Sequence, residues 1–91
     1  MTDTFIYERD VKWLAEADFV VAEVTQPSLG VGYELGFAEA HGKPTLCLFR
    51  PASGRSLSAM IRGNARFVTR DYGTLEEAAA VIDGFVGGLA L

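Results

Sequence analysis

The sequence predicts an α/β domain in which a parallel sheet carries helices on both faces. Continuous apolar, β-branched segments alternate along the chain with segments whose apolar residues recur at helical spacing. The apolar segments lack the polar alternation of a strand with one solvated face, which is typical of strands buried on both faces. With 91 residues, 49% of them hydrophobic and 22% charged, the chain has room for a single domain over residues 1–91.

The first half of the chain predicts two helices around one strand. Residues 8–17 carry apolar side chains at helical spacing, which predicts a short helix. Residues 19–24 form a β-branched run that ends at a polar loop, which predicts a strand. Residues 31–41 predict a second helix, for which Gly42 is the stop signal.

The second half of the chain predicts two more strands and two more helices. Residues 45–49 (TLCLF) predict a buried strand, and residues 66–69 predict a weaker one. After a turn that contains proline, residues 56–62 predict a short helix. Residues 75–86 predict a final helix with Thr74 as its N-cap.

Charge is unevenly distributed along the chain. Residues 1–39 carry eight acidic and two basic side chains, residues 40–70 carry six basic and no acidic ones, and the net charge of the chain is −4. The acidic total argues against nucleic acid as a partner. The basic block predicts an anion site, half of a complementary interface, or a set of solvated arginines.

The sequence also limits compartment and metal chemistry. A single cysteine, Cys47, cannot form an intramolecular disulfide, and His41 has no second histidine or cysteine at ligand spacing. No apolar run approaches the roughly 18 residues of a membrane span, and the N-terminus does not read as a secretory signal. We therefore expect a cytoplasmic protein with no membrane contact and no metal.

The loop after the first predicted strand is rich in glycine. Gly30, Gly32 and Gly36 follow a G-x-G-x-x-x-G spacing, which differs from the dinucleotide fingerprint, and no P-loop lysine follows them. A nicotinamide or ATP site is therefore disfavoured. The glycines still let the backbone approach a ligand, and the next helix offers free N–H groups to an anion.

Two carboxylates are candidates for chemistry. We expect Glu34 in the first turn of its helix, where the helix dipole favours the ionised form of a nucleophile, and Asp10 near the start of the preceding helix. Most glycosidases use a pair of carboxylates in different environments to break the glycosidic bond. The alternative for each residue is a helix-start acid with no catalytic role.

A long run of residues closely resembles the 2′-deoxynucleoside 5′-monophosphate N-hydrolases of the nucleoside 2-deoxyribosyltransferase superfamily. The resemblance extends from about Phe5 to about Tyr72, and its most specific strings are AEVTQPSLGVGYELG and LCLFRPASGRSLSAMIRG. It implies a Rossmann-like (flavodoxin-like) three-layer fold that is N-terminally truncated to about three strands, because family members begin with a strand and a Gly-rich loop that precede residue 1 here. We therefore expect the strand at 19–24 to be an exposed edge.

The resemblance also implies roles for individual residues. It places the nucleophile at Glu34, within GYELG, and the second carboxylate at Asp10, where it orients the sugar and assists proton transfer at the base. Ser28 and the backbone of Gly30 correspond to phosphate contacts, and Ser58 to a phosphate ligand supplied by the other subunit of a homodimer with a shared active site.

The expected activity is hydrolysis of a deoxynucleoside 5′-monophosphate to free base and 2-deoxyribose 5-phosphate, without a cofactor. Arg55 and Arg62 are further substrate-binding candidates, inferred from the charge of the basic block alone. Alternatives are a nucleoside 2-deoxyribosyltransferase and a ribonucleotide hydrolase that acts on CMP. An alternative of another class is an inactive nucleotide-binding or dimerisation fragment.

Overall fold

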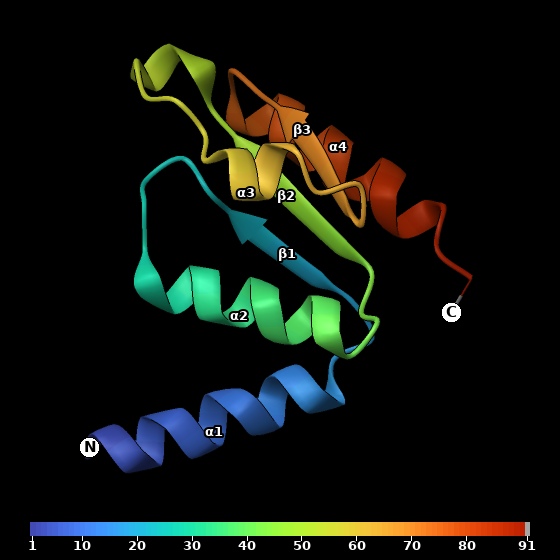
Figure 1. The fold of residues 1–91 in the computed structure, drawn as a ribbon. Helices are drawn as coiled ribbons and strands as arrows, with labels where there is room; N and C mark the ends of the chain where they lie inside the picture. Colours follow the sequence, from blue (N-terminus) through green and yellow to red (C-terminus); the bar gives the residue numbers. More distant parts are fainter. Residues whose placement is uncertain (91) are drawn as a thin grey trace.

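The computed structural model describes residues 1–90 and shows an open parallel sheet with helices on both faces (Figure 1). The sheet has three strands, which lie side by side in sequence order: β1 (Val20–Glu23), β2 (Thr45–Phe49) and β3 (Phe67–Asp71). The helices are α1 (Asp3–Glu16), α2 (Leu29–Ala40), the short 3-10 helix η1 (Pro51–Ser53), α3 (Ala59–Arg62) and α4 (Leu75–Gly87). The predicted α/β class with a three-stranded parallel sheet is confirmed.

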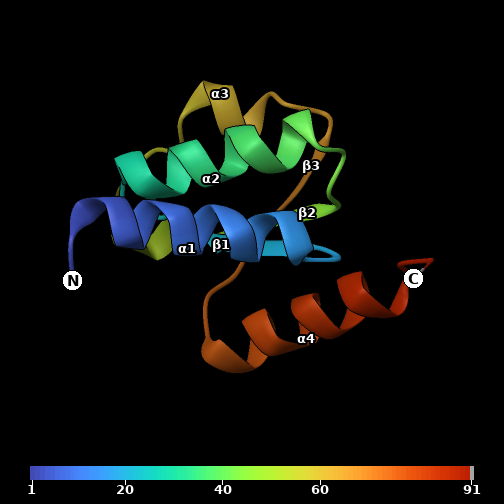
Figure 2. The same ribbon diagram turned by 90° about the horizontal axis from the view of Figure 1, so that it is seen from below.

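The helices form two layers around the sheet. Figure 2 shows α2 and α3 on one side of the strands and α4 on the other. Helix α1 packs along α2 and lies toward the β1 side of the sheet. Among the described residues β1 pairs only with β2, so the strand is the sheet edge that the sequence predicts.

The core is organised around β2, whose five residues are all buried. Cys47 and Phe49 pack with Leu35 of α2 on one face of the sheet. Leu46 and Leu48 point to the other face and pack against α4. Burial raises the pKa of the Cys47 thiol to about 11, so this cysteine behaves as a core residue.

Capping side chains set the helix starts, and two starts differ from the prediction. The Thr2 hydroxyl accepts a hydrogen bond from the backbone N–H of Phe5 (3.1 Å), so α1 begins well before residue 8. The Ser28 hydroxyl accepts one from Val31 (3.2 Å), so α2 includes residues before Val31. Both serve as N-caps, which the apolar periodicity of the helices did not indicate.

The later elements differ from the prediction by a few residues. Helix α3 is shorter than the predicted range 56–62 because Ser58 is its N-cap. Strand β3 is displaced by one residue and continues to Asp71. Thr74 caps α4 as predicted, and its hydroxyl accepts a hydrogen bond from the backbone N–H of Glu77 (3.1 Å).

Within residues 1–90, no helix has both the length and the apolar character needed to cross a bilayer.

Substitution of Leu46 by alanine is expected to lower the free energy of unfolding by about 2–5 kcal/mol, because the side chain is fully buried between β2 and α4. The matched control is Leu75→Ala, at a leucine that is 84% exposed, for which we expect a change below about 0.5 kcal/mol. Urea unfolding of both variants makes the comparison. Equal effects at the two positions would contradict the described core.

Candidate active site

Both predicted catalytic carboxylates line one cavity between α1 and α2. We call it the carboxylate cavity; its volume is about 220 Å³ and its lining residues are Tyr7, Asp10, Val11, Leu14, Gly30, Tyr33 and Glu34. The α1 residues in this lining recur at helical spacing, so a single helix face supplies them. Asp10 and Glu34 are both half-buried, which leaves each carboxylate accessible from the cavity.

The positions of Asp10 and Glu34 in their helices exclude the alternative role of a helix-start acid. Helix α1 begins at Asp3, so Asp10 lies in the middle of the helix. Helix α2 begins at Leu29, so Glu34 lies beyond the first turn in which we expected it. The effect of the helix dipole falls off within the first turn. The helix-start role is therefore wrong for both residues, and so is the dipole argument for an ionised Glu34.

Arg9 orients the Asp10 carboxylate. Its Nε lies 3.1 Å from Asp10 Oδ1, in a partly exposed ion pair. The Arg9 guanidinium also lies over the Trp13 ring, 4.6 Å from the centroid, and over the Phe5 ring at 5.8 Å. An exposed pair of this kind adds little stability. Its consequence is geometric, because one carboxylate oxygen is paired with Arg9 while the other accepts no hydrogen bond from residues 1–90.

Two tyrosines line the carboxylate cavity, and sequence reasoning did not single them out as site residues. The Tyr7 and Tyr33 rings meet edge to face, with their centroids 6.3 Å apart. Hydrogen bonding with Tyr7 raises the pKa of Tyr33, so its phenol is neutral at neutral pH. The spacing in the sequence could have identified both tyrosines, because Tyr7 precedes Asp10 by one helical turn and Tyr33 directly precedes Glu34.

The predicted phosphate ligands divide between two places. Gly30 lines the carboxylate cavity, whereas Ser28 and Ser58 line a different groove between α2 and α3. We call it the serine groove; its volume is about 420 Å³, and its lining includes Pro27, Ser28, Gly32, Gly36, Ser58, Met60 and Ile61. Both serines are exposed and cap helices, since Ser58 Oγ accepts the backbone N–H of Met60 at 3.2 Å.

The carboxylate cavity and the serine groove lie on opposite faces of α2. Glu34 faces the first, and Gly32 and Gly36 face the second. At 100° per residue, Glu34 is separated from both glycines by more than a third of a turn. Ser58 therefore does not line the cavity that holds Glu34 of the same chain.

The two arginine candidates line neither of these sites. Arg62 forms an ion pair with Asp71 (3.1 Å) and lies over the Phe49 ring, 5.4 Å from its centroid. The backbone N–H of Arg55 donates to Ser53 Oγ at 3.2 Å, in the turn before α3. The structure thus joins Asp10, Glu34 and Gly30 and leaves both arginines outside the group.

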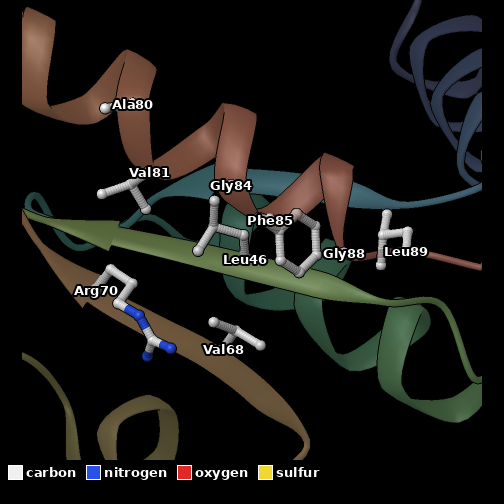
Figure 3. A pocket seen from close by; sticks show the side chains of 9 residues that line it. All are labelled: Leu46, Val68, Arg70, Ala80, Val81, Gly84, Phe85, Gly88 and Leu89. Atoms are coloured by element: carbon white, nitrogen blue, oxygen red, sulfur yellow. The ribbon is translucent and has the colours of Figure 1, made fainter.

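A further cavity in the structure is lined by none of the predicted site residues. It has a volume of about 490 Å³ and lies between α4 and the β2–β3 part of the sheet (Figure 3). Its lining is mainly apolar, and Arg70 is the charged residue in it. Within residues 1–90, no group of three or more histidine, cysteine, aspartate or glutamate side chains lies close enough to hold a metal ion.

The chain is similar in sequence to several curated proteins. The 5-hydroxymethyl-dUMP N-hydrolase of Mus musculus is 73% identical over 73 residues, which are 77% of this chain and 42% of that protein. The protein of the same name from Esox lucius is 53% identical over 91 residues, covering 97% of this chain and 62% of that protein. The Homo sapiens protein of that name is 67% identical over 73 residues, 77% of this chain and 42% of its own length.

The chain thus spans about half the length of the curated relatives it matches. A sequence model of the nucleoside 2-deoxyribosyltransferase family matches residues 1–60, which include α1, β1 and α2 with both carboxylates. Because that match covers more than half of the sequence, this chain belongs to the nucleoside 2-deoxyribosyltransferase family.

Proposed function

We propose that this chain hydrolyses the N-glycosidic bond of 2′-deoxynucleoside 5′-monophosphates to give free base and 2-deoxyribose 5-phosphate. The observation that carries the proposal is the carboxylate cavity, in which Asp10 of α1 and Glu34 of α2 meet. Two carboxylates that flank one site are the usual equipment of glycoside hydrolysis. The names of the relatives support the substrate class, and 5-hydroxymethyl-dUMP is the first substrate to test.

The reaction uses a covalent intermediate in this proposal. A Glu34 carboxylate oxygen attacks the anomeric carbon, the bond from that carbon to the base nitrogen breaks, and its electron pair leaves with the base, which takes up a proton. Asp10 orients the sugar and assists that proton transfer. Water then attacks the same carbon and loses a proton, the bond to Glu34 breaks, and 2-deoxyribose 5-phosphate leaves. The chain's own carboxylates carry every step, so the mechanism uses no metal and no organic cofactor.

The N-terminal end of α2 supplies the phosphate contacts. Ser28 is its N-cap and Gly30 lies in its first turn, where backbone N–H groups have no partner within the helix. Such a terminus binds anions through these N–H groups and the helix dipole. A Cβ at Gly30 would have Ser28 Oγ as its nearest neighbour, at 3.8 Å, so the backbone here is open to a ligand.

We infer that the active enzyme is a homodimer in which Ser58 of one copy completes the site of the other. Ser58 lines the serine groove and not the carboxylate cavity of its own chain, and the family resemblance assigns this serine to the site of the other subunit. The exposed surface beside the serine groove suits such a contact. Leu29 is 96% exposed and Met60 82% exposed, and a Cβ added at Gly32 or Gly36 would meet nothing within 4 Å.

A cytoplasmic location is part of the same proposal. The single cysteine, Cys47, is buried and reduced, which suits a reducing compartment.

The family name supports a second candidate activity, transfer of the deoxyribosyl group to another base. Transfer would use the same glycosyl-Glu34 intermediate, with an acceptor base in place of water. Excess free adenine in a reaction with 5-hydroxymethyl-dUMP separates the two activities. Formation of dAMP indicates transfer, and 2-deoxyribose 5-phosphate as the sole sugar product indicates hydrolysis.

Replacement of Glu34 by glutamine should lower base release from 5-hydroxymethyl-dUMP more than about a thousandfold while the fold remains intact, because the nucleophile is lost. Base release is followed by HPLC, and circular dichroism checks the fold. The matched control is Glu76→Gln on the exposed surface of α4, for which we expect unchanged turnover. A wild-type chain without base release, or an active Glu34→Gln variant, would contradict the proposal.

Two substitutions at Ser28 separate its capping role from phosphate binding. Ser28→Ala is expected to lower the free energy of unfolding by about 0.5–2 kcal/mol, because α2 loses its cap. Ser28→Asp keeps the cap but places a negative charge where the phosphate binds, so stability stays near wild type while the KM for the monophosphate rises. Chemical denaturation and steady-state kinetics measure the two effects. Normal KM in the Ser28→Asp protein would show that Ser28 does not contact phosphate.

A mixing experiment tests the shared site. Glu34→Gln and Ser58→Ala proteins are each expected to be nearly inactive alone. In a mixed dimer, one site contains both wild-type residues, so a re-equilibrated equimolar mixture should recover about a quarter of wild-type base release. If the mixture stays inactive while size-exclusion chromatography shows exchanged dimers, the assignment of Ser58 to the partner's site is wrong.

A further inference from the structure

A hydrogen-bonded network joins the carboxyl ends of the three strands. The Glu23 carboxylate, at the end of β1, accepts hydrogen bonds from the backbone N–H of Thr25 (2.6 Å) and from the Thr25 hydroxyl (2.8 Å). It also accepts one from the Tyr72 hydroxyl, directly after β3. Thr25 Oγ1 in turn accepts the backbone N–H of Arg50, directly after β2 (2.9 Å). We call these four residues the strand-end network.

The strand-end network holds the beginning of the loop that leads into α2. Val24 is buried and anchors the chain in the core, but residues 26–28 are exposed. Thr25 is therefore the last hydrogen-bonded residue of the network before Ser28. It is bonded directly to Glu23 and Arg50, and Glu23 links it to Tyr72. No step of the proposed mechanism uses these residues.

The charge state of Glu23 fits this role. Desolvation opposes ionisation, but the hydrogen bonds from Tyr72 and Thr25, with the nearby charge of Arg50, outweigh it and lower the pKa of Glu23. The bond to Glu23 raises the pKa of Tyr72. At neutral pH the pair is therefore a carboxylate acceptor and a phenol donor, which is the arrangement that the geometry requires.

We propose that Glu23 is a positioning residue for phosphate recognition, which acts through Thr25 and Tyr72 to fix the loop that presents Ser28 and the N-terminus of α2. This inference rests on the proposed function for its ligand, a sugar 5′-phosphate. Glu23 does not touch the substrate. Its effect is to remove conformational freedom from the loop before binding, which improves affinity by pre-organisation.

The first test needs no turnover. In Glu23→Gln and Tyr72→Phe proteins, backbone amide exchange of Thr25, Gln26 and residues 28–30 should accelerate while that of β2 stays unchanged, and the dissociation constant for 2-deoxyribose 5-phosphate should rise about tenfold. Affinity for 2-deoxyribose, which lacks the phosphate, should not change. The matched control for the charge is Asp83→Asn on the exposed surface of α4, which should leave both quantities at wild-type values. Unchanged loop exchange, or unchanged phosphate affinity with a loosened loop, would overturn the proposal.

Kinetics distinguish positioning from a general loss of structure. Tyr72→Phe should raise the KM for the monophosphate and leave kcat close to wild type, whereas unfolding would lower the active fraction and therefore kcat. Thr25→Ser should retain wild-type KM because it keeps the hydroxyl, and Thr25→Val should raise it. If the wild-type chain releases no base, the proposed function is refuted but the proposal for Glu23 is not. The amide-exchange and binding measurements then still decide the role of Glu23.

Discussion

Complete burial of β2 is the constraint on which the rest of the structure depends. Because all five residues of this strand are buried, α2 and α3 must cover one of its faces and α4 the other. Parallel pairing on both sides then places the ends of β1, β2 and β3 at one edge of the sheet. The chain leaves that edge toward α2, so the buried strand decides where Ser28, Gly30 and Glu34 lie.

The catalytic pair depends on a much weaker contact. Helix α1 has no buried residue, yet it supplies Asp10 to the carboxylate cavity. Its C-terminal end is held by Lys43, whose Nζ donates to the carbonyl oxygens of Ala15 (2.9 Å) and Ala17 (2.8 Å). Glu34 thus lies on α2, which packs against the core, whereas Asp10 lies on α1, which has no buried residue. The fold can therefore be stable while the site is easily disturbed.

Local sequence patterns predicted the elements well and their boundaries less well. The continuous apolar runs located the first two strands, and the range 45–49 was correct. The starts of α1 and α2 were wrong because Thr2 and Ser28 cap these helices before their apolar periodicity begins. Because the helix starts were wrong, Asp10 and Glu34 were also given an incorrect alternative role as helix-start acids. Their position at one cavity depends on packing between α1 and α2, which local sequence patterns do not describe.

The site was only partly predictable for the same reason. Family resemblance selected Asp10 and Glu34, and physical reasoning from the residues left each open. The bond between Glu23 and Tyr72 joins residues 49 positions apart and has no local signal. Arg55 and Arg62 were chosen from the sign of their charge, and a sum of charges over a segment contains no information on which face of the molecule each side chain occupies.

A shared site for Asp10 and Glu34 requires α1 and α2 to pack together in solution as they do here. The most direct test is a NOESY spectrum of the wild-type chain, read for cross-peaks between the ring protons of Tyr7 and Tyr33, whose centroids lie 6.3 Å apart. Cross-peaks between the two rings would place both carboxylates at one cavity, as we predict. A folded sheet with no contact between the rings of α1 and α2 would contradict the shared site.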